Sequence, residues 1–241
     1  MDKITEELNI RRKKFSFKFA KALVHILYPR PKFVYLGETF QEEPFIFLVN
    51  HAGSNVPTRV ELYFPHDFYM WGTYEMTINL KGVQKYLIHT YYHQKKKVPL
   101  FFAAIIGTIF APFARMFYKG MHLIPTYPDE RSMNSIIQSL RVMKDNNAIV
   151  IYPEDSSDGY KDEIQKVFNG CLYLAEACKR KGYDIPIYVS YYQKKKKTFV
   201  IDKPILFSVL DKEYDGNKDA ISEALRIRMN SLRTYKNPNK C

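Results

Sequence analysis

The chain has 241 residues, of which 46% are hydrophobic and 26% are charged; this balance excludes wholesale disorder and predicts one globular domain. The 37 basic and 25 acidic residues give a formal net charge of +12, which favours a polyanionic partner: nucleic acid, an anionic membrane surface, or a phosphorylated or CoA-type substrate. Three cysteines, Cys171, Cys178 and Cys241, cannot form a disulfide framework, and no signal-peptide pattern opens the chain. These features predict a cytoplasmic protein.

The first patterned segment, residues 11–30, combines basic and apolar residues at helical spacing. We assign residues 1–31 to a basic amphipathic N-terminal helix. Such a helix fits two interpretations: it lies in a lipid headgroup layer, or it packs on the domain with a solvated lysine face. The basic face consists of Lys14, Lys18, Lys21 and His25, and the apolar arc consists of Phe15, Phe19, Ala22, Leu23, Ile26 and Leu27.

Further along, segments of strand and helix character alternate. Strands are expected at residues 31–37, 44–50, 67–71, 147–154, 185–192 and 198–205, and helices at 132–144, 162–181 and 217–233. This alternation predicts a single α/β domain with a mixed, largely parallel sheet flanked by helices. The domain spans residues 32–235, and a polar tail follows at 236–241.

Residues 98–114 form an uncharged apolar run between Lys97 and Arg115. A membrane-spanning helix needs about 20 apolar residues, and prolines and a glycine interrupt this run. We therefore expect a buried hairpin or a membrane-dipping element rather than a full span. The lysine runs at 95–97 and 194–197 are expected to be solvated turns.

Two polar segments directly follow expected buried strands, FLVNHAGSN (47–55) and IVIYPEDSSDG (149–159). Ligands of α/β proteins bind at the carboxyl ends of strands, so His51 and Glu154 are candidates for chemistry. An imidazole that titrates near neutrality can remove a proton from a hydroxyl as that oxygen attacks an acyl carbonyl. A carboxylate at Glu154 can orient the hydroxyl or the imidazole. Each residue taken alone has a purely structural alternative.

Taken in order, seven segments resemble the motifs of the phospholipid/glycerol acyltransferase family, of the lysophosphatidic acid acyltransferase type. They are NHAGSNV (50–56), VPLFF (98–102), GMHLIPT (120–126), YPED (152–155), FNGCLYLA (168–175), DIPIYVS (184–190) and VIDKPI (200–205). The resemblance covers about residues 33–235. It implies an acyltransferase-like α/β domain that moves a fatty acyl group from acyl-CoA or acyl carrier protein to a hydroxyl or amine of a lipid-like acceptor.

The resemblance also implies roles for particular residues. His51 would be the general base and Glu154 would position the acceptor; these are the catalytic candidates. The substrate-binding candidates are Asn50, Ser54, Asn55, Thr126, Arg131, Pro153 and Asp155. No metal or bound cofactor is expected, since the acyl donor is a co-substrate and no zinc spacing, Walker loop or Rossmann glycine motif occurs.

Membrane lipids and the acyl donor are the expected partners. The N-terminal basic helix and residues 98–114 would contact the membrane, so we expect a cytoplasmic protein that is peripheral or monotopic at the inner face of the membrane. Net charge alone supports nucleic-acid binding, which is therefore the weakest interpretation.

Three positions depart from the family pattern. Val56 stands where the family has the Asp that orients the histidine. Thr126 stands where the family has an arginine, and Asp155 stands where it has a glycine. Two arginines that the family associates with the acceptor's phosphate are absent from their usual positions. Replacing a triad's acid can reduce the rate by about 10⁴. The alternative hypothesis is therefore a catalytically weak or inactive homologue that binds lipid or a partner.

Overall fold

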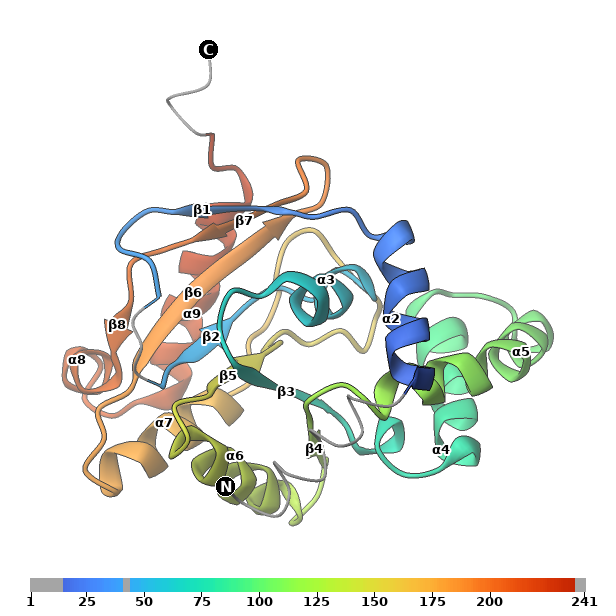
Figure 1. Cartoon of the computed structure of the whole chain (residues 1–241). Helices are drawn as coiled ribbons and strands as arrows, with labels where there is room; N and C mark the ends of the chain where they lie inside the picture. The colour runs from blue at the N-terminus through green and yellow to red at the C-terminus, as the bar shows by residue number, and fades with distance from the viewer. Residues whose placement is uncertain (1–14, 41–43, 237–241) are drawn as a thin grey trace.

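The computed structural model describes residues 15–40 and 44–236, in which eight strands form one mixed sheet with helices on both faces (Figure 1). The strand order is β1-β7-β6-β2-β5-β3-β4, and β8 pairs with β6 beside this path. Strand β6 runs antiparallel to β7 and β8, whereas the other described pairs are parallel. The predicted fold class, α/β with a mixed, largely parallel sheet, is confirmed.

The strands begin and end within a few residues of the expected segments. They are β1 (Lys32–Tyr35), β2 (Ile46–Leu48), β3 (Phe68–Thr73), β4 (Leu123–Thr126), β5 (Ala148–Ile151), β6 (Pro186–Gln193), β7 (Thr198–Ile201) and β8 (Ile205–Leu206). The expected turn at Lys194–Lys197 joins β6 to β7 as an antiparallel hairpin. Strand β4 and the short β8 were not separate expectations.

Side chains that alternate along the central strands build two cores. Ile46 and Leu48 of β2 face helices α6 (Ser132–Met143), α7 (Gly170–Arg180), α8 (Phe207–Glu213) and α9 (Lys218–Arg233). Phe47 and Val49 face helices α2 (Phe15–Leu27) and α3 (Asn55–Tyr63). Because both faces are covered, the central strands are apolar throughout, as expected for parallel strands.

Several helices lie where none was expected. Helix α3 follows the His51 segment directly, and α8 follows β8. Helix α4 (Leu80–Lys85) runs into η2 (Tyr86–Lys95), which has π-helical hydrogen bonding. The helix expected at 162–181 begins only at Gly170, because the preceding residues form a loop whose Val167 bridges to Glu154.

The apolar run at 98–114 is not a hairpin: it belongs to one continuous helix, α5 (Leu100–Tyr118). Pro99 is the N-cap residue, where a missing N–H costs nothing, and Pro112 lies inside the helix. Ala103, Gly107 and Ala111 are buried at four-residue spacing. A Cβ on Gly107 would lie 2.5 Å from Ile88 Cγ1 of η2, so the glycine allows α5 to pack closely against η2.

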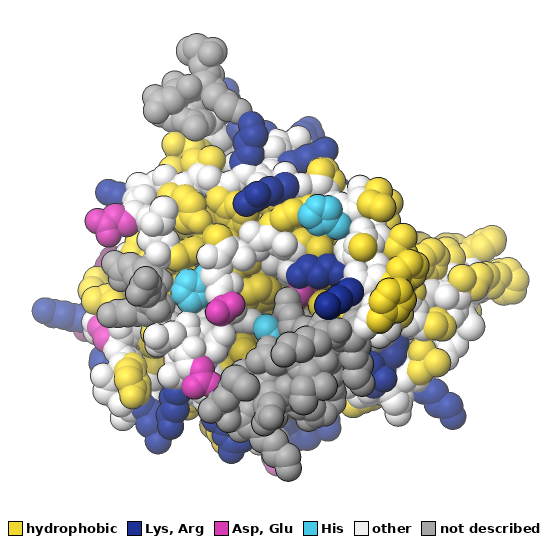
Figure 2. Space-filling view, viewed as in Figure 1, with side chains coloured by type: hydrophobic (Ala, Val, Ile, Leu, Met, Phe, Trp, Pro, Cys, Tyr) yellow, Lys and Arg dark blue, Asp and Glu magenta, His cyan; other side chains and the backbone are white. Residues whose placement is uncertain are grey.

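The opposite side of α5 is exposed and apolar. We define the α5 apolar face as Leu100, Phe101, Phe102, Ile105, Ile109 and Phe110. Figure 2 shows hydrophobic side chains gathered at the end of the molecule where Figure 1 places α5. Among the described residues, α5 is the one helix long and apolar enough to cross a membrane by length and composition.

Helix α2 is the described part of the expected N-terminal helix; residues 1–14, with Lys14, lie outside the described residues. Its buried side is made by Phe17, Ala20 and Val24. Phe17 stacks on Phe117 of α5, with ring centroids 5.9 Å apart. The expected apolar arc is therefore not the packing side: Phe15, Phe19, Leu23, Ile26 and Leu27 are exposed.

Candidate functional site

The site begins at Asn50, directly after β2. Asn50 is buried, its Oδ1 accepts a hydrogen bond from the Tyr192 N–H at 2.6 Å, and its Nδ2 lies 3.5 Å from the Tyr192 carbonyl oxygen. The side chain thus joins the end of β2 to the neighbouring strand β6. This geometry fixes the direction in which the chain leaves the sheet, and therefore the place of His51.

His51 is half-buried at the carboxyl edge of the sheet. Its ring lies 5.0 Å from the Tyr152 ring and stacks on Tyr160 at 4.9 Å with an interplanar angle of 24°. Its Nδ1 is buried without a hydrogen-bond partner among the described residues. Burial, followed by the positive charge of Lys95, lowers the pKa of His51 to about 3. The imidazole is therefore neutral at physiological pH.

Glu154 follows β5, the strand next to β2, and reaches the same place. Its Oε1 accepts a hydrogen bond from the His51 backbone N–H at 2.7 Å. Burial raises the pKa of Glu154 to about 8, although the His51 N–H and the charge of Lys95 act in the opposite direction. The two catalytic candidates are thus brought together, but through the histidine's backbone and not through its ring.

Position 56, where the resembled family has its orienting aspartate, cannot orient the His51 ring. Val56 is fully buried in the core between α3 and the sheet. Asp67, another acid near His51 in sequence, precedes β3 at the opposite end of the sheet. Among the described residues, no hydrogen bond joins a carboxylate to the His51 ring. The orienting acid is therefore not replaced in this arrangement.

Three residues that were not among the site candidates, Lys95, Tyr152 and Tyr160, complete the site. Lys95 was expected in a solvated turn, but it lies at the end of η2 with its Nζ 5.3 Å from the centre of the Tyr160 ring. Burial lowers the pKa of Lys95, and the negative charges of Glu154 and Asp155 act in the opposite direction. The signal for Tyr160 is present in the sequence: it is the single aromatic residue in the polar stretch EDSSDGYKDE. We call His51, Lys95, Tyr152, Glu154 and Tyr160 the His51 cluster.

Two substrate-binding candidates lie beside this cluster at the start of α3. The Ser54 Oγ contacts the hydroxyls of Tyr28 at 3.1 Å and Tyr91 at 3.2 Å. Asn55 Oδ1 accepts a hydrogen bond from Arg59 Nη1 at 2.9 Å. Both side chains thus have partners within the protein that fasten the loop after His51.

The loop after β5 carries two more candidates. The buried Pro153 accepts a hydrogen bond from the Phe168 N–H through its carbonyl oxygen, at 2.7 Å. Asp155 is exposed, and hydrogen bonds from Ser157 lower the pKa of its carboxyl group. Pro153 therefore shapes the loop, whereas Asp155 lies on its outer side.

The remaining candidates are not brought to His51. Thr126 ends β4, which is separated from β2 by two strands, or roughly 14 Å at the usual strand spacing. Its Oγ1 donates to the Gly72 carbonyl oxygen at 3.1 Å. Arg131 is exposed, pairs with Asp129 at 2.6 Å and lies over the Tyr127 ring. No described contact joins either residue to the His51 cluster.

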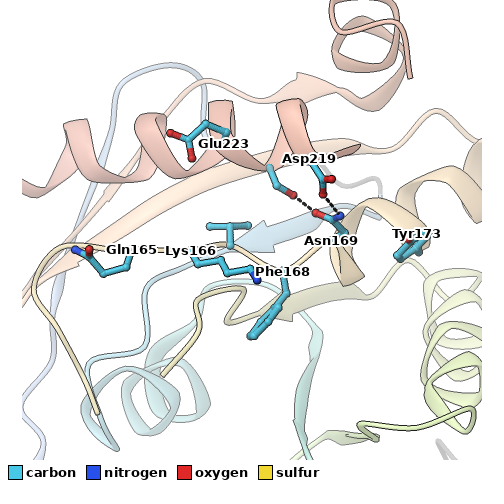
Figure 3. Close-up of a pocket in the computed structure, with 9 residues that line it drawn as sticks. Gln165, Lys166, Phe168, Asn169, Tyr173, Asp219 and Glu223 are labelled. Atoms are coloured by element: carbon cyan, nitrogen blue, oxygen red, sulfur yellow. Dashed lines mark hydrogen bonds between the residues drawn. The ribbon is translucent and has the colours of Figure 1, made fainter. Parts of the chain in front are cut away.

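Two cavities lie away from the His51 cluster. One, of about 570 Å³, lies between the start of α7 and α9 and is lined by Asn169, Tyr173 and Asp219, among others (Figure 3). There Asn169 donates to Asp219 at 2.7 Å, so the polar groups bind one another. A second, of about 620 Å³, is lined in part by His25 and Tyr63. The His51 cluster lines neither of these two cavities.

Within residues 15–40 and 44–236, no three His, Cys, Asp or Glu side chains are grouped to hold a metal ion. The fold and site together define an α/β protein with a histidine and a carboxyl group at adjacent strand ends. No family model and no curated protein matches the chain.

Among solved structures, the 1-acyl-sn-glycerophosphate (LPA) acyltransferase PlsC from Thermotoga maritima has a similar structure, with a TM-score of 0.49 and 11% sequence identity. The alignment covers 92% of this chain and 80% of that chain. At this level of similarity, the chemistry has to be argued from this chain's own residues.

Proposed function

We propose that this protein is an acyltransferase that moves a fatty acyl group from acyl-CoA or acyl carrier protein to a hydroxyl or amine of a lipid-like acceptor. One observation carries the proposal: His51 and Glu154 follow adjacent parallel strands and lie side by side at the carboxyl edge of the sheet. The His51 backbone N–H donates to Glu154 Oε1 at 2.7 Å. Open α/β sheets bind their ligands at this edge. The ordered family-like motifs in the sequence support the same chemistry.

In this reaction His51 takes the proton from the acceptor as its oxygen or nitrogen attacks the thioester carbonyl. The new bond to the carbonyl carbon forms, the bond from that carbon to sulfur breaks, and the proton passes from the imidazole to the leaving thiolate. Glu154 holds the His51 backbone in place, and at neutral pH its largely protonated carboxyl group can donate a hydrogen bond to the acceptor. The acyl donor is consumed as a co-substrate, and the step uses no metal.

The protein's surface supports a lipid-like acceptor. The α5 apolar face and the exposed apolar residues of α2 leave large hydrophobic side chains in water, with Phe101 71% exposed and Phe15 82% exposed. Contiguous apolar surface of this kind is typical of membrane or protein contacts. Lys18 is exposed on α2, and the net charge of +12 favours anionic lipids. We place the protein at the cytoplasmic membrane surface, with α2 and α5 in contact with lipid.

A specific observation favours the second candidate, a homologue that binds lipid or a partner with little turnover. The buried Val56 and the ring of His51 without a carboxylate partner leave the base unoriented. A pKa of about 3 also makes the imidazole a weak base, because general bases work best when their pKa lies near the operating pH.

The test uses the purified protein on anionic vesicles, with labelled acyl-CoA or acyl carrier protein and a panel of lysolipids and amines. His51→Ala is compared with His89→Ala, which removes an exposed histidine from η2. The proposal predicts transfer by the wild type and by His89→Ala, and a rate about 10²–10⁴ lower for His51→Ala. Equal rates in all three proteins would remove His51 from the mechanism. Vesicle binding without transfer to any acceptor would instead support the binding homologue.

A further inference from the structure

Residues 155–161 carry Tyr160, which lies over the His51 ring. This segment leaves β5 after Glu154, and Tyr160 near its end stacks on the imidazole with ring centroids 4.9 Å apart. A substrate atom that takes a proton from, or gives one to, the imidazole must lie within about 3 Å of a ring nitrogen. Tyr160 covers one face of the ring, and Nδ1 is buried. The described arrangement is therefore closed on that side.

The segment is fastened to the end of η2 by a small set of contacts. Lys95 Nζ donates to Ser156 Oγ at 2.8 Å, and Gln94 Nε2 donates to the Ser157 carbonyl oxygen at 3.2 Å. The Lys95 and Lys96 ammonium groups lie 5.3 and 5.6 Å from the centre of the Tyr160 ring. These are hydrogen bonds and cation–π contacts, which can be exchanged for contacts with water or a ligand.

A glycine also permits the backbone of this segment to lie close to η2. Gly159 is buried with φ 101°, a conformation that side chains rarely adopt, and a Cβ there would lie 3.0 Å from the Lys95 carbonyl oxygen. The neighbouring Asp158 is exposed. The segment therefore combines a glycine that allows contact with η2 and an exposed polar part that has little apolar packing to hold it.

The closed arrangement also leaves polar atoms without partners. His51 Nδ1 and Tyr160 Oη are both buried, and neither has a hydrogen-bond partner among the described residues. An unpaired buried polar atom is unfavourable. A ligand or water that offers partners to these atoms therefore competes with the closed arrangement.

From these contacts we infer that residues 155–161 are a lid, in which Tyr160 covers His51 and moves off the imidazole to admit a substrate. Lys95 and Lys96 are the clamp that holds the lid closed. The lid deepens the proposed function, because it determines when His51 can meet an acceptor. Its test needs no substrate, so failure of the lid and failure of acyl transfer give separate results.

Opening has a measurable electrostatic consequence. The charged and titratable groups facing His51 are Lys95 at the end of η2, Lys96 directly after it, Glu154 after β5, and the two tyrosines, Tyr152 and Tyr160. Burial is the first cause of the lowered pKa of His51, and the lysine charges come next. Removing the cover exposes the ring to water and so raises its pKa.

The experiment follows the His51 ring by NMR between pH 4 and pH 8 and measures its modification by diethyl pyrocarbonate with peptide mapping. In the wild type, we expect no titration of His51 in this range and slower modification than at the exposed His89. In Tyr160→Ala, the pKa rises from about 3 toward the ordinary value of 6.5, and modification approaches the rate of His89. Tyr160→Phe keeps the stacked ring and should leave His51 as in the wild type.

Lys95→Met is the second variant, and it decides the outcome if Tyr160→Ala does not fold by circular dichroism. It removes the clamp charge and keeps an apolar stem, so His51 should again become easier to protonate and to modify. Two results would overturn the lid: wild-type His51 modified as fast as His89, or His51 unchanged in a folded Tyr160→Ala or Lys95→Met protein.

Discussion

The His51 cluster buries polar atoms, whereas the α5 apolar face exposes hydrophobic side chains. In the cluster, His51 Nδ1 and Tyr160 Oη are withdrawn from water without partners. On α5, large side chains such as Phe101 and Ile109 remain in water at 71% and 68% exposure. Both arrangements are unfavourable in an isolated protein, and each is relieved by a ligand of a different kind.

A single membrane-bound amphiphile would relieve both the unpaired polar atoms and the exposed apolar side chains. Its polar end would supply hydrogen-bond partners to the cluster, and the bilayer around its acyl chains would cover the α5 apolar face. The two regions are also connected, because Lys95 ends η2 and α5 packs closely against η2 through Gly107. The contrast therefore predicts that changes on α5 alter membrane binding, whereas changes near His51 alter stability, titration and chemistry.

The largest effect is expected on α5. Phe101→Ser combined with Ile109→Ser removes two exposed apolar side chains, and we expect a loss of roughly 3 kcal/mol of membrane binding, or about 100-fold in affinity. Sedimentation with anionic vesicles measures this. The matched control is Val209→Ser with Ile227→Ser, which are similarly exposed elsewhere. Equal loss in both double variants would mean that α5 has no special part in binding.

The next effect concerns Asn50, which holds the chain in place directly before His51. Asn50→Ala leaves the buried Tyr192 N–H without its 2.6 Å partner, so the free energy of unfolding should fall by about 1–3 kcal/mol. For a protein of this size, that corresponds to a Tm lower by roughly 2–12 °C. Calorimetry measures the change, and Asn134→Ala on the exposed side of α6 should stay within about 0.5 kcal/mol of the wild type. An unchanged Tm for Asn50→Ala would show that water replaces the amide.

The smallest effect, measured over one pH unit, is the pH dependence contributed by Glu154. Because burial raises its pKa to about 8, the folded protein holds this proton at pH values where the unfolded chain has released it. Its contribution to the free energy of unfolding therefore falls as pH rises from about 4.5 to about 8, by about 1.4 kcal/mol per pH unit within that window. Urea unfolding at pH 6.5 and 7.5 measures this slope.

Glu154→Gln should remove the fall, whereas Asp158→Asn, at an exposed carboxylate, should keep it. His51 acts in the other direction: its lowered pKa makes the protein lose stability as pH falls from about 6.5 to about 3. A Glu154→Gln protein with the wild-type slope would show that Glu154 is ionised in the folded state at neutral pH.

Sequence analysis predicted the parts of this contrast that depend on local pattern. The apolar runs that became β2 and β5 located the carboxyl edge, and this was sufficient to select His51 and Glu154. The local pattern did not indicate Lys95 or Tyr160, because a lysine run and a polar loop are usually solvated. The burial of these two side chains depends on contacts between distant segments.

The same limit explains why the hairpin expected as one alternative at residues 98–114 is wrong. Proline and glycine signalled an interrupted element, but the chain forms one continuous helix. Gly107 packs closely against Ile88 of η2, and Ala111 shares a small core with Val83, Tyr86 and Leu87. Tertiary contacts that the local pattern does not contain thus decided both the helix and the exposed face that it presents.

The central claim, that the acyl group is transferred at the His51 cluster, is tested most directly by finding where the acyl donor lies. A photoactivatable acyl-CoA is crosslinked to the vesicle-bound protein, with unlabelled acyl-CoA as competitor, and the labelled peptides are mapped. We predict competed labelling within residues 50–54 and 152–160. Competed labelling confined to the cavity around Asn169 and Asp219 in Figure 3, with none beside His51, would contradict the claim.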